Sequence, residues 1–229
     1  VAGAYPHLSY FLGPYGRVSF FDPDNPLRYE VGVSARASYV ARPGLTFVGV
    51  IRQPVLGTLA DTTRVSNSVL PHVRSDWARY SQESDLQIGN LTAEYLWRPG
   101  PDLFARVTAG YLEEMYGGLS AELLWFPAES HLAFGAELNY VTSRDFDMLF
   151  GFQDYDVVTG HVSMYYDTPG DYHLQVDVGR YLAGDFGVTF GLDREFNNGF
   201  KVGAFATLTN VSSADFGEGS FDKGIRFEV

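Results

Sequence analysis

The chain has 229 residues, of which 45% are hydrophobic, 16% aromatic and 19% charged, and its formal net charge is -12. This length suits one large domain or two small ones, and the aromatic content argues against intrinsic disorder. The absence of cysteine excludes a disulfide framework and a thiolate metal site, and the acidic balance argues against a nucleic-acid partner, which needs a basic surface.

The first part of the chain predicts β-strands with two chemically different faces. An opening strand is expected within 5–22, and segment 27–41 places apolar residues at nearly every odd position and charged or small residues at the even ones, including Arg28 and Arg36. Successive side chains of a strand point to opposite faces, so one face is apolar and the other polar. A short turn at 42–44 follows this strand.

A long polar link is expected at 55–84. Within it, segment 70–80 is amphipathic, and Val73, Trp77 and Tyr80 could share one face of a helix. A loop of this length can fold inward, so these residues and Arg74 are the candidates for a plug.

The same period of two continues to the end of the chain. Alternating segments lie at 103–111, 119–126, 131–140, 161–166, 173–178, 188–193 and 200–208, with a closing strand at 223–229. Short turns are expected at 98–101, 127–130, 168–171 and 197–199, and longer links at 113–118, 142–156, 182–186 and 210–222. The sequence therefore predicts about twelve strands, joined alternately by short and long connections.

Three features favour a transmembrane β-barrel over a soluble sandwich or a lipocalin-like barrel. Aromatic residues such as Trp97, Trp125 and Tyr140 close the apolar face at its ends, as membrane interfaces favour. The other face is small and polar, with lysine only at 201 and 223 in the whole chain. Short turns at one end and longer loops at the other are typical of outer-membrane barrels. We predict an all-β, antiparallel barrel that spans the bacterial outer membrane, with short periplasmic turns and longer extracellular loops.

Several irregular strings carry a family resemblance. They are LPHVRSDWARY (70–80), RPGPDLFARVTAGYLEEMYGG (98–118), GAELNYVTSRDFD (135–147), FGFQDYDVVTGH (150–161), VGRYLAGDFG (178–187), DREFNNGFKVGAFATLTNV (193–211) and FGEGSFDKGI (216–225). They resemble the C-terminal barrel of the YjbH/GfcD family of Gram-negative outer-membrane proteins, which are linked to exopolysaccharide biosynthesis and group 4 capsule secretion. The resemblance implies that residues 1–229 form one barrel of a longer, two-barrel protein.

Possible acid–base chemistry is the first alternative to a binding or transport role. His161, His173 and Asp177 are expected on the inner face of neighbouring strands, where they could form a proton-transfer cluster. The opposing interpretation is that these groups satisfy one another in a polar lumen. The chain has no Gly-x-Ser-x-Gly elbow and no recognisable triad order, so we expect no enzymatic activity.

Candidate glycan contacts lie in the lumen and in the loops. In the lumen they are Arg28, Arg36, Arg106, Glu137, His161, Tyr165, Asp177 and Asp193; in the loops they are Arg144, Asp145, Asp147, Asp154, Asp215 and Glu218. Aromatic rings can stack on sugars while charged groups bond hydroxyls. Alternatively, the lumen charges pair and fill the barrel, and Arg144 pairs with a neighbouring aspartate. The DxD spacings lack the twelve-residue calcium loop, so neither a metal nor a cofactor is expected.

The resemblance and the barrel together imply a role in exopolysaccharide or capsule production, in which glycan is bound or conducted without covalent chemistry. Expected partners are the lipid bilayer, a polysaccharide, and periplasmic or lipoprotein components of such a system. The alternatives are a filled barrel that holds periplasmic partners, and a general small-solute porin.

Overall fold

The computed structural model describes residues 5–20, 25–62, 70–71, 73–74, 76–212, 215 and 221–228. This part of the chain forms twelve strands, a 3-10 helix and a short α-helix. The elements are β1 (His7–Phe20), β2 (Leu27–Arg42), β3 (Leu45–Gly57), η1 (Leu59–Asp61), α1 (Trp77–Glu83), β4 (Gln87–Gly100), β5 (Leu103–Tyr111), β6 (Tyr116–Trp125), β7 (Leu132–Arg144), β8 (Phe152–Asp167), β9 (Tyr172–Arg180), β10 (Phe186–Glu195), β11 (Lys201–Thr209) and β12 (Lys223–Glu228). The prediction of an all-β chain with about twelve strands is confirmed.

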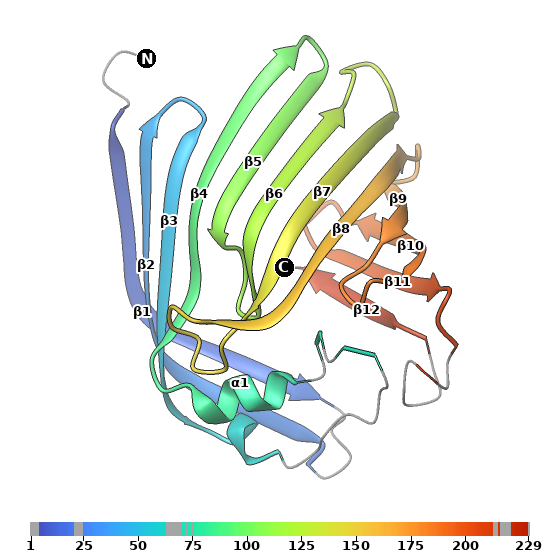
Figure 1. Ribbon diagram of the computed structural model, residues 1–229. Coiled ribbons are helices and arrows are strands. Elements are labelled where there is room, and N and C mark those ends of the chain that lie inside the picture. Colours follow the sequence, from blue (N-terminus) through green and yellow to red (C-terminus); the bar gives the residue numbers. More distant parts are fainter. Residues whose placement is uncertain are drawn as a thin grey trace.

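The strands form one antiparallel sheet in chain order, from β1 to β12. Figure 1 shows this sheet strongly curved, with β1–β3 on one side of β4–β8 and β9–β12 on the other. Between the described residues of β1 and β12 no strand pairing is formed. Each strand is therefore held by its sequence neighbours, as in an up-and-down barrel.

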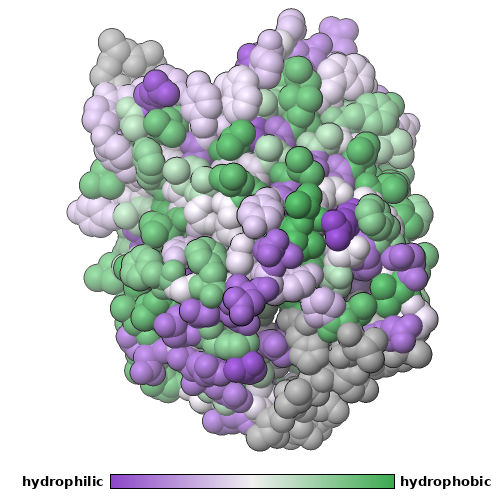
Figure 2. Space-filling view, in the orientation of Figure 1, coloured by the Kyte–Doolittle hydropathy of each residue, from purple (hydrophilic) through white to green (hydrophobic). Residues whose placement is uncertain are grey.

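The apolar side chains of the strands point away from the curved interior. In β2, the apolar odd positions such as Leu27 and Val33 are exposed, whereas Arg28 and Glu30 between them are buried. Figure 2 shows apolar side chains spread over the wall of β4–β8, and hydrophilic ones gathered at the end near α1. The predicted orientation, apolar outside and polar inside, is confirmed.

Contacts across the interior show that the sheet curls around its polar face. Arg17 of β1 lies 3.0 Å from Glu114, which follows β5, and Arg52 of β3 also pairs with Glu114. In a flat sheet, β1 and β5 would be separated by about 19 Å at the usual strand spacing, which is beyond the reach of an arginine. We call the face that carries Arg17, Glu30 and Arg106 the interior.

Exposed aromatic residues form a belt on the outer face near one end of the sheet. Tyr95 stacks with Trp97, Trp125 stacks with Phe134, and all four are exposed. Members farther along the belt include Tyr39, Tyr166 and Phe196, and half-buried Phe200 packs against Phe196. The predicted aromatic closure of the apolar face is therefore present at the end where the short turns lie.

The connections alternate largely as predicted, and we call their two locations the short-turn end and the long-loop end. The turn at 168–171 and the link at 210–222 have the predicted bounds. The links predicted at 113–118 and 142–156 are shorter in the structure, 112–115 and 145–151, because β6, β7 and β8 extend into them. No helix in the described part of the chain is long and apolar enough to cross a membrane.

The helix predicted within 70–80 lies later in the β3–β4 connection (58–86). Val73 and Arg74 form turns, in which the amide of Val73 bonds the carbonyl of Pro71 and the amide of Trp77 bonds that of Arg74. The helix α1 begins only at Trp77. The prediction that Val73, Trp77 and Tyr80 share one helical face is wrong, because Val73 precedes the helix.

Candidate functional site

Polar side chains pair with one another along the interior of β4–β8. Arg106 lies 2.5 Å from Glu122 and 3.9 Å from Glu94. These pairs follow from the register, which places Arg106 opposite Glu122. All three side chains remain partly exposed, so solvent or a polar ligand can reach them.

A second polar group lies on β7 and β8. His161 Nδ1 is 2.9 Å from Glu137, and Asn139 donates hydrogen bonds to Thr159 and Glu137. The ring of His161 also packs edge-on against Tyr181. Tyr165 lies on the same face, half-buried beside Gly135. Four of the predicted lumen residues, Arg106, Glu137, His161 and Tyr165, therefore line one continuous wall.

The possible acid–base cluster of His161, His173 and Asp177 does not form. His173 pairs with Asp167, six residues along β8 from His161, which is about 20 Å at the rise of a strand. Asp177 lies closer to His161 in the register, but its carboxylate accepts hydrogen bonds from Gln175. Within the described chain, no hydrogen bond or ion pair joins any two of these three residues.

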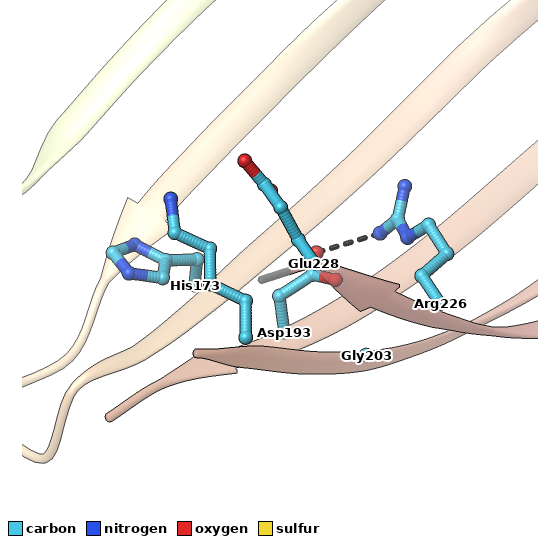
Figure 3. Close-up of a pocket in the computed structure, with 6 residues that line it drawn as sticks. His173, Asp193, Gly203, Arg226 and Glu228 are labelled. Atoms are coloured by element: carbon cyan, nitrogen blue, oxygen red, sulfur yellow. Dashed lines mark hydrogen bonds and ion pairs between the residues drawn. The ribbon is translucent and has the colours of Figure 1, made fainter. Parts of the chain in front are cut away.

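A pocket of about 270 Å³ opens at the short-turn end. It is lined by His173, Asp193, Lys201, Gly203, Arg226 and Glu228. Figure 3 shows Asp193 bonded to Arg226, at 2.6 Å. Lys201 lies 3.2 Å from Glu195, so the charges around this pocket are largely paired.

At the long-loop end, the interior becomes apolar. Tyr116, Val141 and Val157 are buried together there, although the same face of β7 and β8 is polar farther along. Val73 of the β3–β4 connection packs against this cluster, with Leu112, Met115, Tyr155 and Leu182 from neighbouring segments. The β3–β4 connection thus inserts an apolar side chain into the mouth of the interior.

Arg144 joins the start of strand β4 to the β5–β6 and β7–β8 loops at this mouth. The side chain is 0% exposed, and its guanidinium donates to the carbonyls of Ile88 and Met148 at 2.8 and 2.7 Å. Further bonds go to the carbonyls of Glu113, Glu114 and Leu149, and the ring of Tyr111 lies 4.3 Å from the guanidinium carbon. The expectation that Arg144 pairs with an aspartate is wrong, because backbone carbonyls surround it.

Tyr80 attaches α1 to the same site. Its side chain is 6% exposed, its hydroxyl donates to the carbonyl of Arg144 at 2.8 Å, and its ring packs edge-on against Phe146. Burial raises the pKa of this hydroxyl to about 12, so it remains a donor at neutral pH. Arg74 adds an ion pair with Glu113 at 2.7 Å, and Trp77 is half-buried. The structure thus places the predicted plug residues at the long-loop end.

The predicted loop carboxylates are dispersed. Asp145 and Asp147 lie in the β7–β8 loop, where Asp147 accepts a bond from the amide of Leu149. Asp154 is not in a loop, because β8 begins at Phe152 and places Asp154 on the same side as exposed Val158. Asp215 is exposed and accepts a bond from Ser212, and Glu218 lies outside the described residues.

Charges of opposite sign occupy different parts of the interior. Strands β1–β3 carry Arg17, Arg28, Arg36 and Arg52, and Glu30 is the one carboxylate on these three strands. The interior positions of β4–β10 are rich in carboxylates, which are Glu94, Glu122, Glu137, Asp167, Asp177, Asp193 and Glu195. A ligand in the interior therefore meets a cationic wall on one side and an acidic wall on the other.

Comparison with known proteins adds a family to this geometry. A family model described as exopolysaccharide biosynthesis protein YbjH matches residues 2–229. The chain belongs to the YjbH family. It is 36% identical over 232 residues to a protein described as the uncharacterized lipoprotein YjbH of Escherichia coli strain K12. That alignment covers 97% of this chain and 33% of the relative, so the chain spans about a third of the relative's length.

The family match confirms the resemblance expected from the loop strings, and connects the chain with exopolysaccharide biosynthesis. The family model also matches residues 2–69, which contain none of the strings that carried the resemblance. Two features were missed from the sequence. The apolar cluster was missed because Val141 and Val157 interrupt the polar face only locally. Glu114 was missed because its two arginine partners lie on β1 and β3.

Proposed function

We propose that this chain is a β-barrel of the bacterial outer membrane that binds or conducts a glycan during exopolysaccharide or capsule production. Family membership supplies the link to exopolysaccharide. The observation that carries the rest is the arrangement of the sheet, with an exposed apolar face, a belt of Tyr and Trp, and a charged interior. Such an arrangement matches a barrel that has lipid outside and polar solutes inside.

The proposed role involves no covalent chemistry and no cofactor. Titratable interior groups are engaged pairwise, as in Glu137–His161 and Asp167–His173. Partly exposed carboxylates and arginines are well suited to hydrogen-bond sugar hydroxyls. We further propose that the barrel is one domain of a longer protein, in keeping with the share of the Escherichia coli relative that it covers, and that periplasmic or lipoprotein components of the same system bind it.

The long-loop end supports a gated interior rather than a permanently open pore. Val73 packs against the apolar cluster at the mouth, and the Arg144 bonds hold the surrounding segments together. In this proposal the β3–β4 connection is a plug, and the glycan path opens when it is displaced. A general porin would be open without such a change.

The same contacts favour one alternative function. If the plug never moves, the protein is a filled barrel that holds periplasmic partners. Arg17, Arg52 and Glu114 support this alternative, because they bridge distant parts of the interior near the plug.

Single-channel conductance of the refolded chain in planar bilayers separates these functions. We compare the wild type with a variant that lacks residues 60–80, and use heat-modifiable migration in detergent gels to verify that each barrel is folded. The proposal predicts a small wild-type current and a larger one in the deletion variant. Added polysaccharide should block the larger current, whereas small sugars should not.

A folded deletion variant without conductance would contradict transport and leave the scaffold. A large wild-type current that polysaccharide does not block would indicate a porin.

A further inference from the structure

Phe11 and Arg36 lie side by side on the interior face of β1 and β2. The strand register places them directly opposite each other. Arg36 has the same parity as buried Arg28 and Glu30, and Phe11 the same parity as Tyr15, whose hydroxyl bonds Glu30. Residues directly opposite on antiparallel strands share one face, with their Cα atoms about 4.5–5.5 Å apart. Both side chains therefore face the interior.

Arg36 differs from the other interior cations. Those cations each have a polar partner: Arg17, Arg52, Arg106, Lys201 and Arg226 pair with carboxylates, and Arg28 donates to the carbonyl of Thr58. Among the described residues, Arg36 has neither a hydrogen bond nor an ion pair, and it is exposed. A guanidinium with five free donors on an interior wall is poised to bind an anion.

Phe11 supplies an apolar surface beside this guanidinium. The side chain is 59% exposed although it faces the interior. A Cβ atom at Gly13 would lie 2.5 Å from Cζ of Phe11, so the ring lies across Gly13. The glycine thus lets the ring lie close to the strand, with its outer face open. Sugar rings pack their C–H faces on such aromatic surfaces.

We propose that Phe11 and Arg36 form a binding subsite for an acidic sugar, in which Arg36 binds the carboxylate and Phe11 stacks on the pyranose ring. This inference rests on the proposed function, and it adds the chemical class of the glycan. The arginines of β1–β3 favour it, because they attract an anion to this side of the interior. The carboxylates of β4–β10 repel the same anion and direct it toward Arg36.

The subsite can be tested by titrating the refolded chain in detergent micelles at about 0.1 M salt, where charges beyond roughly 10 Å are screened. The probes are a galacturonic acid tetramer and maltotetraose, which have similar size but different charge. The variants are Arg36→Gln, Arg36→Lys and Phe11→Leu, with Arg98→Gln at the short-turn end as the control. Arg36 has no partner in the described structure, so its replacement should leave the fold unchanged.

The wild type and Arg98→Gln should bind the acidic tetramer about tenfold more tightly than maltotetraose, the typical contribution of one charge-assisted contact. Arg36→Gln should remove this preference, Arg36→Lys should retain part of it, and Phe11→Leu should weaken both sugars alike. Equal wild-type affinity for the two sugars, or a preference that survives Arg36→Gln, would overturn the subsite and leave the proposed function intact. Binding of neither sugar by the folded chain would contradict both.

Discussion

Replacing Arg144 should loosen the long-loop end without unfolding the strands. The Arg144→Met variant keeps an unbranched side chain but removes every donor of the guanidinium. Five carbonyl oxygens lose their hydrogen bonds, and three of those bonds, to Ile88, Glu113 and Met148, are 2.9 Å or shorter. Because these carbonyls lie in strand β4, in the β5–β6 loop and in the β7–β8 loop, their separation from Arg144 should free these segments from one another.

The size of the effect follows from these bonds. A hydrogen bond from a charged donor contributes about 1.5–3 kcal/mol net, so the three short bonds set a scale of roughly 5 kcal/mol. Carbonyls at a mouth regain water when the loops separate, which reduces the loss to about 3–4 kcal/mol. Since about 1.4 kcal/mol is a tenfold change, the ratio of closed to open mouths should fall by more than a hundredfold.

Limited proteolysis of the folded protein in micelles measures this directly. Cleavage within the β5–β6 and β7–β8 loops of Arg144→Met should be faster than in the wild type by roughly the same factor, while the strands stay protected. The control is Arg98→Met, which removes an exposed arginine whose Nε bonds the carbonyl of Gly100 at the other end of the sheet. Equal cleavage of Arg144→Met and Arg98→Met would refute the view that Arg144 holds the mouth closed.

Three further predictions concern single side chains. Val73→Asp places a charge in the apolar cluster and should release the β3–β4 connection. Arg74→Gln removes an exposed ion pair with Glu113 and a cation–π contact with Tyr116, and should change protection by only about 1–2 kcal/mol. Hydrogen exchange of the connection compares the two variants, and similar exchange in both would argue against an apolar seal. Tyr80→Phe removes the hydrogen bond from the Tyr80 hydroxyl to the carbonyl of Arg144. Because burial raises the pKa of this hydroxyl from 10.0 to about 12, the greater protease resistance of the wild type should be complete below pH 10 and vanish as the pH rises to about 12. A difference in protease resistance that does not change with pH in this range would contradict the prediction. Leu138 lies midway along β7 on the outer face and is 62% exposed. Leu138→Arg should therefore destabilise the barrel in lipid vesicles by about 2–4 kcal/mol, whereas Asn139→Arg on the interior face should destabilise it less. Urea titration measures both variants, and the reverse order would mean that the two faces are misassigned.

The strands were predictable because each is a local pattern. The alternation of apolar and polar residues in 27–41 determines which side of β2 faces outward, whatever the neighbouring strands are. Gly and Pro mark the short turns for equally local reasons. For these reasons the strand order and the two faces followed from the sequence.

The long-loop end was less predictable because its contacts join distant segments. Arg144 bonds the carbonyl of Ile88, 56 positions away, and backbone acceptors leave no trace in the sequence. Helix α1 begins only at Trp77, near the end of the amphipathic stretch 70–80, and Val73 before it packs against the apolar cluster. Tertiary contacts therefore outweighed helical periodicity in this segment.

The most direct test of the central claim is whether glycan contacts the interior in cells that make the polymer. The chain has no native cysteine, so a photoreactive maleimide can be attached to Ser120→Cys on the interior face of β6, or to Ala121→Cys on the outer face. After irradiation, we expect polysaccharide to be crosslinked at position 120 and absent at position 121. Labelled and folded protein with no glycan at position 120, or with equal amounts at both positions, would contradict it.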